Sequence, residues 1–162
     1  MMNHTTTSTG EQRRGSFNEI RFDRESVAII GTGATGSYAA LTLARMGVGS
    51  IYTYDADIVE PHNIDAQLFG LSSIGKPKVS ALAEIIKEIT GVLVHSYNQF
   101  VEDANNFPKT VFCLTDTMLS RQKIWKSLNP FSTRWLIETR MGLDSCRIYT
   151  IDITSQNTRK CY

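Results

Sequence analysis

The residues best able to do chemistry form a glycine loop between an apolar segment and an acid. Gly31, Gly33 and Gly36 follow the apolar run 27–30. Glycines at this spacing allow a tight turn, an approach of backbone N–H groups to phosphate, and close packing of the next helix on the strand. The N-terminus of that helix attracts an anion. Asp55 lies about 20 residues further on, where a carboxylate can accept ribose hydroxyls. The pattern predicts a nucleotide site, which on these residues alone could hold NAD, FAD or ATP.

A polar segment after Asp55 favours ATP over a dinucleotide. It contains Asn63 and Gln67 and leads to Lys78 at the start of a predicted helix. A lysine there opposes the helix dipole unless an anion lies between them. We therefore interpret Lys78 as a cation for a triphosphate, with Asn63 and Gln67 as hydrogen-bond donors. The alternative is a solvated loop with a surface lysine.

Asp116 follows a predicted strand and precedes a predicted helix. Ligand sites in open α/β sheets lie outside the carboxyl ends of the strands, where a carboxylate can hold Mg²⁺. The alternative for Asp116 is a helix N-cap, with Thr115 and Thr117 as competitors. Arg121, one helical turn later, fits either a structural ion pair or a role in the site.

The elements that position these residues follow from hydrophobic periodicity. The predicted strands are 27–30, 51–54, 92–97, 110–114, 135–138 and 147–153, and the predicted helices are 35–46, 76–90 and 117–128. Residues 56–75 are expected to form a long loop with at most a short helical piece. The alternation predicts an α/β, Rossmann-like fold with a mostly parallel sheet and helices on both faces. We expect a flexible segment at 1–20 and one nucleotide-binding domain at 21–162.

Composition narrows the classes of protein that fit. The 162 residues carry a net charge of +1, which offers no electrostatic case for a nucleic acid or an acidic membrane. No apolar run approaches the roughly 20 residues that span a bilayer. Cys113, Cys146 and Cys161 are too widely spaced for a disulfide framework or a CxxC zinc site. We expect a reduced, cytoplasmic protein without zinc.

Taken together, the motifs resemble those of the ThiF/MoeB/HesA-type adenylating domain of the ubiquitin-activating enzyme superfamily. The matching motifs are the GxGxxG loop, D-x-D-x-V after the second strand, N-x-x-x-Q, I-G-K-P-K at a helix start, and a later T-D, over residues 27–153. The resemblance implies ATP and Mg²⁺ as cofactors. The nucleotide-binding residues that it implies are Gly31, Gly33, Ala34, Gly36, Asp55, Asp57, Asn63, Gln67 and Lys78. The catalytic residues that it implies are Asp116, Lys78 and Arg121, with Asp116 holding the metal.

The implied reaction is adenylation of the C-terminal carboxylate of a ubiquitin-like or sulfur-carrier protein, which yields an acyl-adenylate and pyrophosphate. Catalysis would come from positioning and charge neutralisation, without a protein nucleophile. The resemblance also implies a homodimer, or a heterodimer with a related subunit.

Three departures from the family pattern bear on activity. First, Ala66 stands where active members carry an arginine, so one alternative to an active adenylating enzyme is a weakened, non-catalytic partner subunit. The glycine loop also leaves a second alternative function, that of an NAD- or FAD-dependent oxidoreductase. Second, family members often receive an arginine from the N-terminal segment of the partner subunit, and the candidates here are Arg13, Arg14 and Arg21. The alternative is that these arginines belong to a solvated basic tail. Relatives continue beyond the length of this chain, which predicts a fragment or a minimal version.

Overall fold

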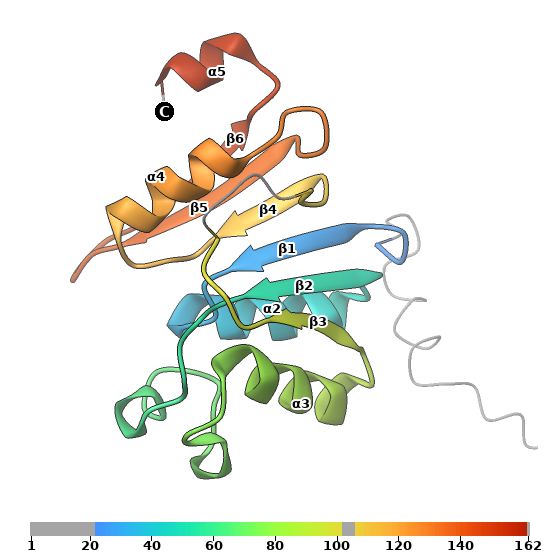
Figure 1. Cartoon of the computed structure of the whole chain (residues 1–162), viewed down its shortest axis with the longest axis vertical. Helices are drawn as coiled ribbons and strands as arrows, with labels where there is room; N and C mark the ends of the chain where they lie inside the picture. The colour runs from blue at the N-terminus through green and yellow to red at the C-terminus, as the bar shows by residue number, and fades with distance from the viewer. Residues whose placement is uncertain (1–21, 102–105, 162) are drawn as a thin grey trace, which may run out of the picture.

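The computed structural model describes residues 22–101 and 106–161. One six-stranded sheet runs through the chain in the order β3-β2-β1-β4-β5-β6 (Figure 1). Its strands are β1 (Ser26–Ile30), β2 (Ser50–Tyr54), β3 (Val94–Tyr97), β4 (Thr110–Cys113), β5 (Trp135–Met141) and β6 (Cys146–Asp152). The first five are parallel, and β6 pairs antiparallel with β5. The expected Rossmann-like, mostly parallel sheet is confirmed.

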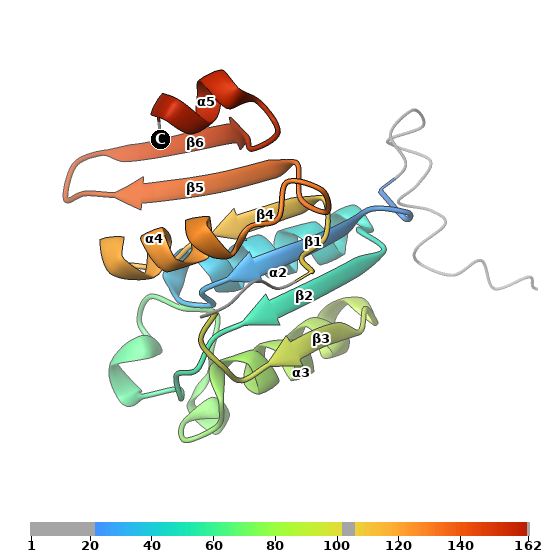
Figure 2. The same cartoon turned by 45° about the horizontal axis from the view of Figure 1, so that its top comes forward.

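Helices cover both faces of this sheet, as predicted (Figures 1 and 2). The helices are α2 (Ala34–Met46), α3 (Lys78–Thr90), α4 (Met118–Ser127) and α5 (Gln156–Cys161). Successive residues of a strand point to opposite faces. Val27 and Ile29 therefore pack with α2 and α3, whereas Ala28 and Ile30 pack on the side of α4. This two-sided burial explains why β1 is a continuous apolar run.

Several boundaries differ from the prediction for local reasons. The second predicted helix begins at Lys78 instead of residue 76, because a residue before proline is biased away from helical geometry and Pro77 caps the helix. β5 continues to Met141 because it pairs with β6 along its whole length. The short helix α5 was not predicted. The long loop contains two 3₁₀ turns, Pro61–Asn63 and Leu71–Ser73.

Two sequence expectations lie outside the described residues. They are the flexible segment at 1–20 and the donated arginine, for which Arg13, Arg14 and Arg21 are the candidates. Within the described ranges, no helix has both the length and the apolar character needed to cross a bilayer.

Candidate functional site

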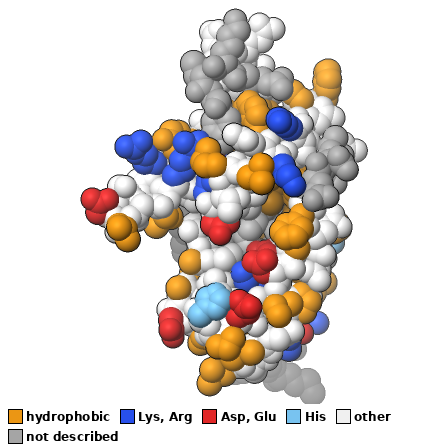
Figure 3. Space-filling view, turned by 60° about the vertical axis from the view of Figure 1, so that its left-hand side comes forward, with side chains coloured by type: hydrophobic (Ala, Val, Ile, Leu, Met, Phe, Trp, Pro, Cys, Tyr) orange, Lys and Arg blue, Asp and Glu red, His pale blue; other side chains and the backbone are white. Residues whose placement is uncertain are grey.

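A cavity of about 700 Å³ opens at the carboxyl ends of β1, β2 and β4. Figure 3 looks at this end of the molecule, where acidic and basic side chains gather around a hollow with hydrophobic side chains beside it. The predicted site residues that line the cavity are Gly31, Gly33, Ala34, Asp55, Asp57, Gln67, Lys78, Asp116 and Arg121. Gly36 and Asn63 are not among its lining residues. Segments far apart in the sequence thus meet at one place.

The three loop glycines have different surroundings. Gly31 has φ +92°, and a Cβ there would lie 2.8 Å from the Leu114 carbonyl oxygen. A Cβ on Gly36 would lie 1.9 Å from the Gly31 carbonyl oxygen, which shows how closely α2 packs on the loop. At Gly33 the nearest atom to a Cβ would be Gln67 Nε2, at 4.0 Å. Gly33 therefore leaves room for a ligand, while Gly31 and Gly36 shape the turn and the packing.

Asp55 fastens the end of β2 to the glycine loop. Its Oδ2 accepts hydrogen bonds from the Thr32 backbone N–H at 2.7 Å and the Thr32 hydroxyl at 2.9 Å. Its Oδ1 accepts one from the Asp57 N–H at 3.0 Å. Because each carboxylate oxygen has about two acceptor positions, Oδ1 can take one further donor. The ribose contact of Asp55 stays a prediction that this geometry allows.

Lys78 reaches the cavity as one half of an ion pair. Its Nζ lies 2.8 Å from Asp57 Oδ2, and its side chain is 9% exposed against 57% for Asp57. Its backbone N–H also donates to the Asp57 carbonyl oxygen at 2.9 Å. One of the three ammonium N–H groups is used by this pair, so the others can face a phosphate. The lysine is held in position before any ligand arrives.

The two amides of the polar loop separate in the structure. Asn63 is buried, and its Oδ1 accepts the Glu60 N–H at 2.9 Å, which closes the first 3₁₀ turn. Gln67 lines the cavity next to Gly33, and its Oε1 is buried without a hydrogen-bond partner among the described residues. A buried polar atom of this kind is normally satisfied by water or a ligand. The structure thus places Gln67, but not Asn63, in the wall of the cavity.

Asp116 is exposed in the cavity wall and is not the cap of α4. Thr117 is the cap, since its hydroxyl oxygen accepts the Ser120 N–H at 3.1 Å. Within 22–101 and 106–161, the Asp116 carboxylate makes no hydrogen bond or ion pair. An accessible carboxylate oxygen is a ligand type that Mg²⁺ prefers.

Arg121 is mostly buried and forms the ion pair that the sequence left open. Its Nη1 lies 2.9 Å from Glu138 Oε1 and donates to the Thr139 carbonyl oxygen at 2.8 Å. Its Nη2 donates to the Thr115 carbonyl oxygen. Arg121 also lines the cavity, so its structural role and its place in the site coexist.

With this geometry established, comparison with known proteins identifies the family. The sequence model of the ThiF family matches residues 16–162. The chain belongs to the ThiF family. It is 35% identical over 106 residues to ubiquitin-like modifier-activating enzyme 5 of Bombyx mori, which covers 64% of this chain and 26% of that protein. It is 45% identical over 83 residues to tRNA threonylcarbamoyladenosine dehydratase of Bacillus subtilis, covering 46% of this chain and 33% of that protein.

Solved structures agree with this assignment. The E. coli tRNA N6-threonylcarbamoyladenosine dehydratase TcdA, in complex with ATP, has a TM-score of 0.60 and 27% identity, over 68% of this chain and 52% of that one. A crystal structure of PaaA superposes with a TM-score of 0.69 at 20% identity, over 88% of this chain and 51% of that one, which supports the fold alone. This ThiF-family chain spans about a quarter to a third of its curated relatives, 26% and 33% in the two cases above.

Part of the cavity lining in this ThiF-family chain was not predicted from the sequence. Ser120 and Lys123 line the cavity from α4, and their i, i+3 spacing on the predicted helix could have found them. Glu138, the buried partner of Arg121, gave no periodic signal because it is one acid in an apolar strand. Ala66 is exposed and is not among the lining residues of the cavity.

The buried cysteine of β4 is not an activated thiol. Burial raises the pKa of the Cys113 thiol. A nucleophilic cysteine needs the opposite shift, because the thiolate is the reactive form.

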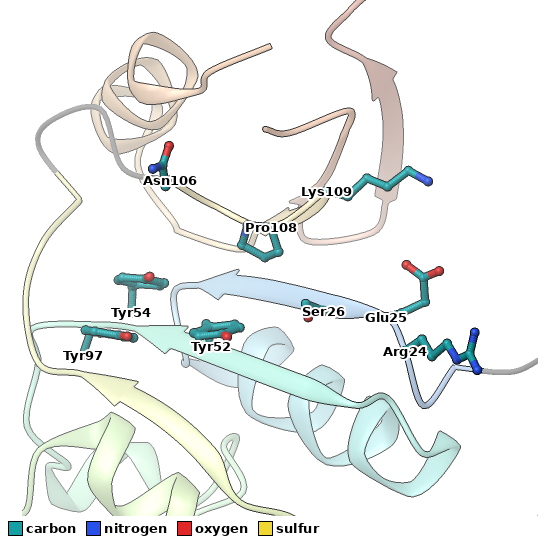
Figure 4. Close-up of a pocket in the computed structure, with 9 residues that line it drawn as sticks. All are labelled: Arg24, Glu25, Ser26, Tyr52, Tyr54, Tyr97, Asn106, Pro108 and Lys109. Atoms are coloured by element: carbon teal, nitrogen blue, oxygen red, sulfur yellow. The ribbon is translucent and has the colours of Figure 1, made fainter. Parts of the chain in front are cut away.

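A second cavity, of about 480 Å³, lies over β2 and β3. Figure 4 shows Tyr52, Tyr54 and Tyr97 on one side of it, with Asn106 and Pro108 opposite. The Tyr54 and Tyr97 rings stack with their centroids 4.7 Å apart. Burial raises the pKa of Tyr54, and the two neighbouring tyrosines raise it further. Of the residues predicted for the nucleotide site, none lines this second cavity.

Proposed function

We propose that this ThiF-family domain adenylates a carboxylate with ATP and Mg²⁺, and that the carboxylate is the C-terminus of a ubiquitin-like or sulfur-carrier protein. The observation that carries the proposal is the cavity in which Gly33, Lys78 and Asp116 meet. An open glycine loop, a held cation and an accessible carboxylate are the groups that a metal–triphosphate complex requires.

The residues that line the cavity fit both ATP and Mg²⁺. Room at Gly33 allows phosphate to approach the start of α2, and Gln67 Nε2, the atom nearest to that room, is a hydrogen-bond donor that a phosphate oxygen could accept from. Asp116 would hold Mg²⁺ through its carboxylate oxygens. When bound, the metal supplies positive charge to the phosphate oxygens.

In the proposed reaction, a carboxylate oxygen of the substrate forms a bond to the α-phosphorus of ATP. The bond from that phosphorus to the oxygen shared with the β-phosphate breaks, so an acyl-adenylate and pyrophosphate result. Lys78 would neutralise charge on the phosphates, and Asp55 would orient the ribose. The domain's contribution is to hold the reacting atoms in line and to stabilise the charge that develops.

A second candidate function is that of a non-catalytic partner in a dimer of related subunits. It is favoured by position 66, where an exposed alanine supplies no cation to the site. On this alternative the domain binds ATP or a partner subunit without turnover. Sedimentation of the purified chain, alone and with a related subunit, would show which dimer forms.

The first test is ATP binding by calorimetry in the presence of Mg²⁺. We expect Lys78→Met to weaken binding by about tenfold to a hundredfold, since hydrogen bonds to charged groups contribute roughly 1.5–3 kcal/mol. Lys76→Met is the matched control, because Lys76 pairs with Glu84 outside the cavity and is 45% exposed.

Three outcomes would contradict the proposal. One is the absence of ATP binding at millimolar Mg–ATP, and another is equal weakening in both lysine variants. Tighter binding of NAD or FAD than of ATP would favour the oxidoreductase alternative. Exchange of labelled pyrophosphate into ATP, with a sulfur-carrier protein ending in Gly-Gly as the probe, separates the catalytic function from the non-catalytic one.

A further inference from the structure

A buried carboxylate lies beside the nucleotide cavity, where α4 packs over β4 and β5 (Figure 1). The Glu138 side chain is 0% exposed. Its Oε1 forms ion pairs with both Arg121 and Arg140. Its Oε2 is buried and has no hydrogen-bond partner in the part of the chain that the structure describes.

Stability alone does not account for this arrangement. Exchange of a buried ion pair for apolar side chains of similar volume is often neutral or stabilising, because burial of two charges costs about as much as their attraction returns. An unpartnered buried carboxylate oxygen adds a further cost. The cluster therefore calls for a role besides stability.

The two arginines differ in how firmly they are held. The Arg121 side chain is 8% exposed, and carbonyl oxygens of Thr115 and Thr139 fix its guanidinium. The Arg140 side chain is 39% exposed, and its guanidinium lies 4.8 Å from the centre of the Tyr149 ring. Arg121 is thus the inner, anchored partner of Glu138, and Arg140 is the outer one.

Arg121 links Glu138 to the loop that carries Asp116. The Thr115 carbonyl that accepts from Arg121 belongs to the residue directly before Asp116. On the strand side, β4 and β5 pair with Cys113 opposite Glu138, so the acid lies level with the end of β4. A chain of contacts therefore connects β5 to the loop that carries the Asp116 carboxylate: Glu138 pairs with Arg121, and Arg121 donates to the Thr115 carbonyl oxygen.

We propose that Glu138 is a positioning residue of the nucleotide site. Its buried charge holds Arg121 in the cavity wall, and Arg121 in turn fixes the Thr115 carbonyl and so the direction of the Asp116 carboxylate. This inference rests on the proposed function, because it takes Asp116 as the Mg²⁺ ligand. Without Glu138, Arg121 becomes a buried cation without a counter-charge and turns away from Thr115.

The test measures the Mg²⁺ concentration that gives half-maximal ATP binding, in the wild type and in variants. Loss of a group that orients a metal ligand costs about tenfold to a hundredfold in metal affinity, so we expect Glu138→Gln to raise this concentration at least tenfold. ATP affinity in EDTA is measured in the same proteins, so that any change in metal-free binding, which a displaced Arg121 would also cause, is separated from the change in Mg²⁺ dependence. Arg140→Gln is the control: it removes the outer partner of the same oxygen and should leave the Mg²⁺ midpoint within about twofold of the wild type.

A double variant, Glu138→Gln with Arg121→Met, covers the case in which Glu138→Gln does not fold. It removes both buried charges, so it should regain thermal stability. On our proposal its Mg²⁺ midpoint stays raised, because nothing holds Thr115. A double variant with the wild-type midpoint would overturn the proposal, as would an unchanged midpoint in a folded Glu138→Gln protein.

The two proposals fail in different ways. A wild-type chain that binds no ATP, or that binds it without any response to Mg²⁺, contradicts the proposed function and the role of Glu138 with it. A wild-type chain that responds to Mg²⁺ beside a Glu138→Gln variant that responds identically contradicts the positioning role alone.

Discussion

One added methyl group should mainly cost stability at the loop glycine Gly36 and mainly cost ATP binding at Gly33. At Gly36 a Cβ would lie 1.9 Å from the Gly31 carbonyl oxygen. Both atoms belong to backbone, so α2 must move away from the loop to accept it. Overpacking costs typically 1–3 kcal/mol, and this contact lies at the upper end. A gain of about 1 kcal/mol in helix propensity offsets part of it, so we expect Gly36→Ala to lower the free energy of unfolding by about 2 kcal/mol.

At Gly33 the same methyl group meets nothing closer than Gln67 Nε2, at 4.0 Å, and the backbone there has a negative φ of −72° with a ψ of −147°. Gly33 is also the N-cap residue of α2, where alanine is less favourable, so we expect a loss of stability below about 1 kcal/mol. The methyl group would, however, occupy room that the proposed phosphate needs. Gly33→Ala should therefore lose ATP binding at least tenfold while it stays folded.

Urea unfolding followed by circular dichroism gives the stability of both variants, and calorimetry gives their affinity for Mg–ATP. Two results would refute the reasoning. One is a Gly36→Ala protein as stable as the wild type, which would mean that α2 does not pack on the loop as described. The other is a Gly33→Ala protein that binds ATP normally, which would place the phosphates elsewhere.

Two further substitutions test the helix cap and the altered loop. Thr117→Ala should destabilise the domain by about 1 kcal/mol, because it leaves the Ser120 N–H without its acceptor; an unchanged unfolding midpoint in urea would assign the cap to another residue. Ala66→Arg should leave stability unchanged, because position 66 is exposed, and should raise pyrophosphate exchange at least tenfold if a phosphate cation is what the site lacks. Equal exchange in Ala66→Arg and the wild type would show that a cation at position 66 adds nothing to this site.

The sequence allowed prediction of the fold because local signals and packing agree in it. β1 is a continuous apolar run since both of its faces are covered. α2 and α3 end at residues 46 and 90 as predicted, and each is followed by a glycine with positive φ that stops the helix. The strand pairing of Trp135–Met141 with Cys146–Asp152 was harder to foresee, because the register of a hairpin depends on a turn without a clear signature.

The sequence allowed prediction of which residue types line the cavity, but not of the contacts that those residues make. Lys78 and Asp57 were both identified, yet their 2.8 Å ion pair depends on the path of the loop between them. Asn63 has the right chemistry for a phosphate donor, but it closes a 3₁₀ turn instead. Glu138 could not be found, because its importance comes from the arginine that folds against it from another element.

The pairing of charges around the cavity bears on which form of ATP it would accept. Lys78 already faces Asp57, and Arg121 already faces Glu138, so two of the cations in the cavity wall are balanced before a ligand binds. Asp116 carries a negative charge with no described partner. A free triphosphate would meet this uncompensated carboxylate and be repelled, whereas a triphosphate that carries a divalent cation would satisfy it. On the proposed function, this arrangement of ion pairs predicts that the metal complex binds more tightly than free ATP and that Asp116 is the residue that distinguishes them.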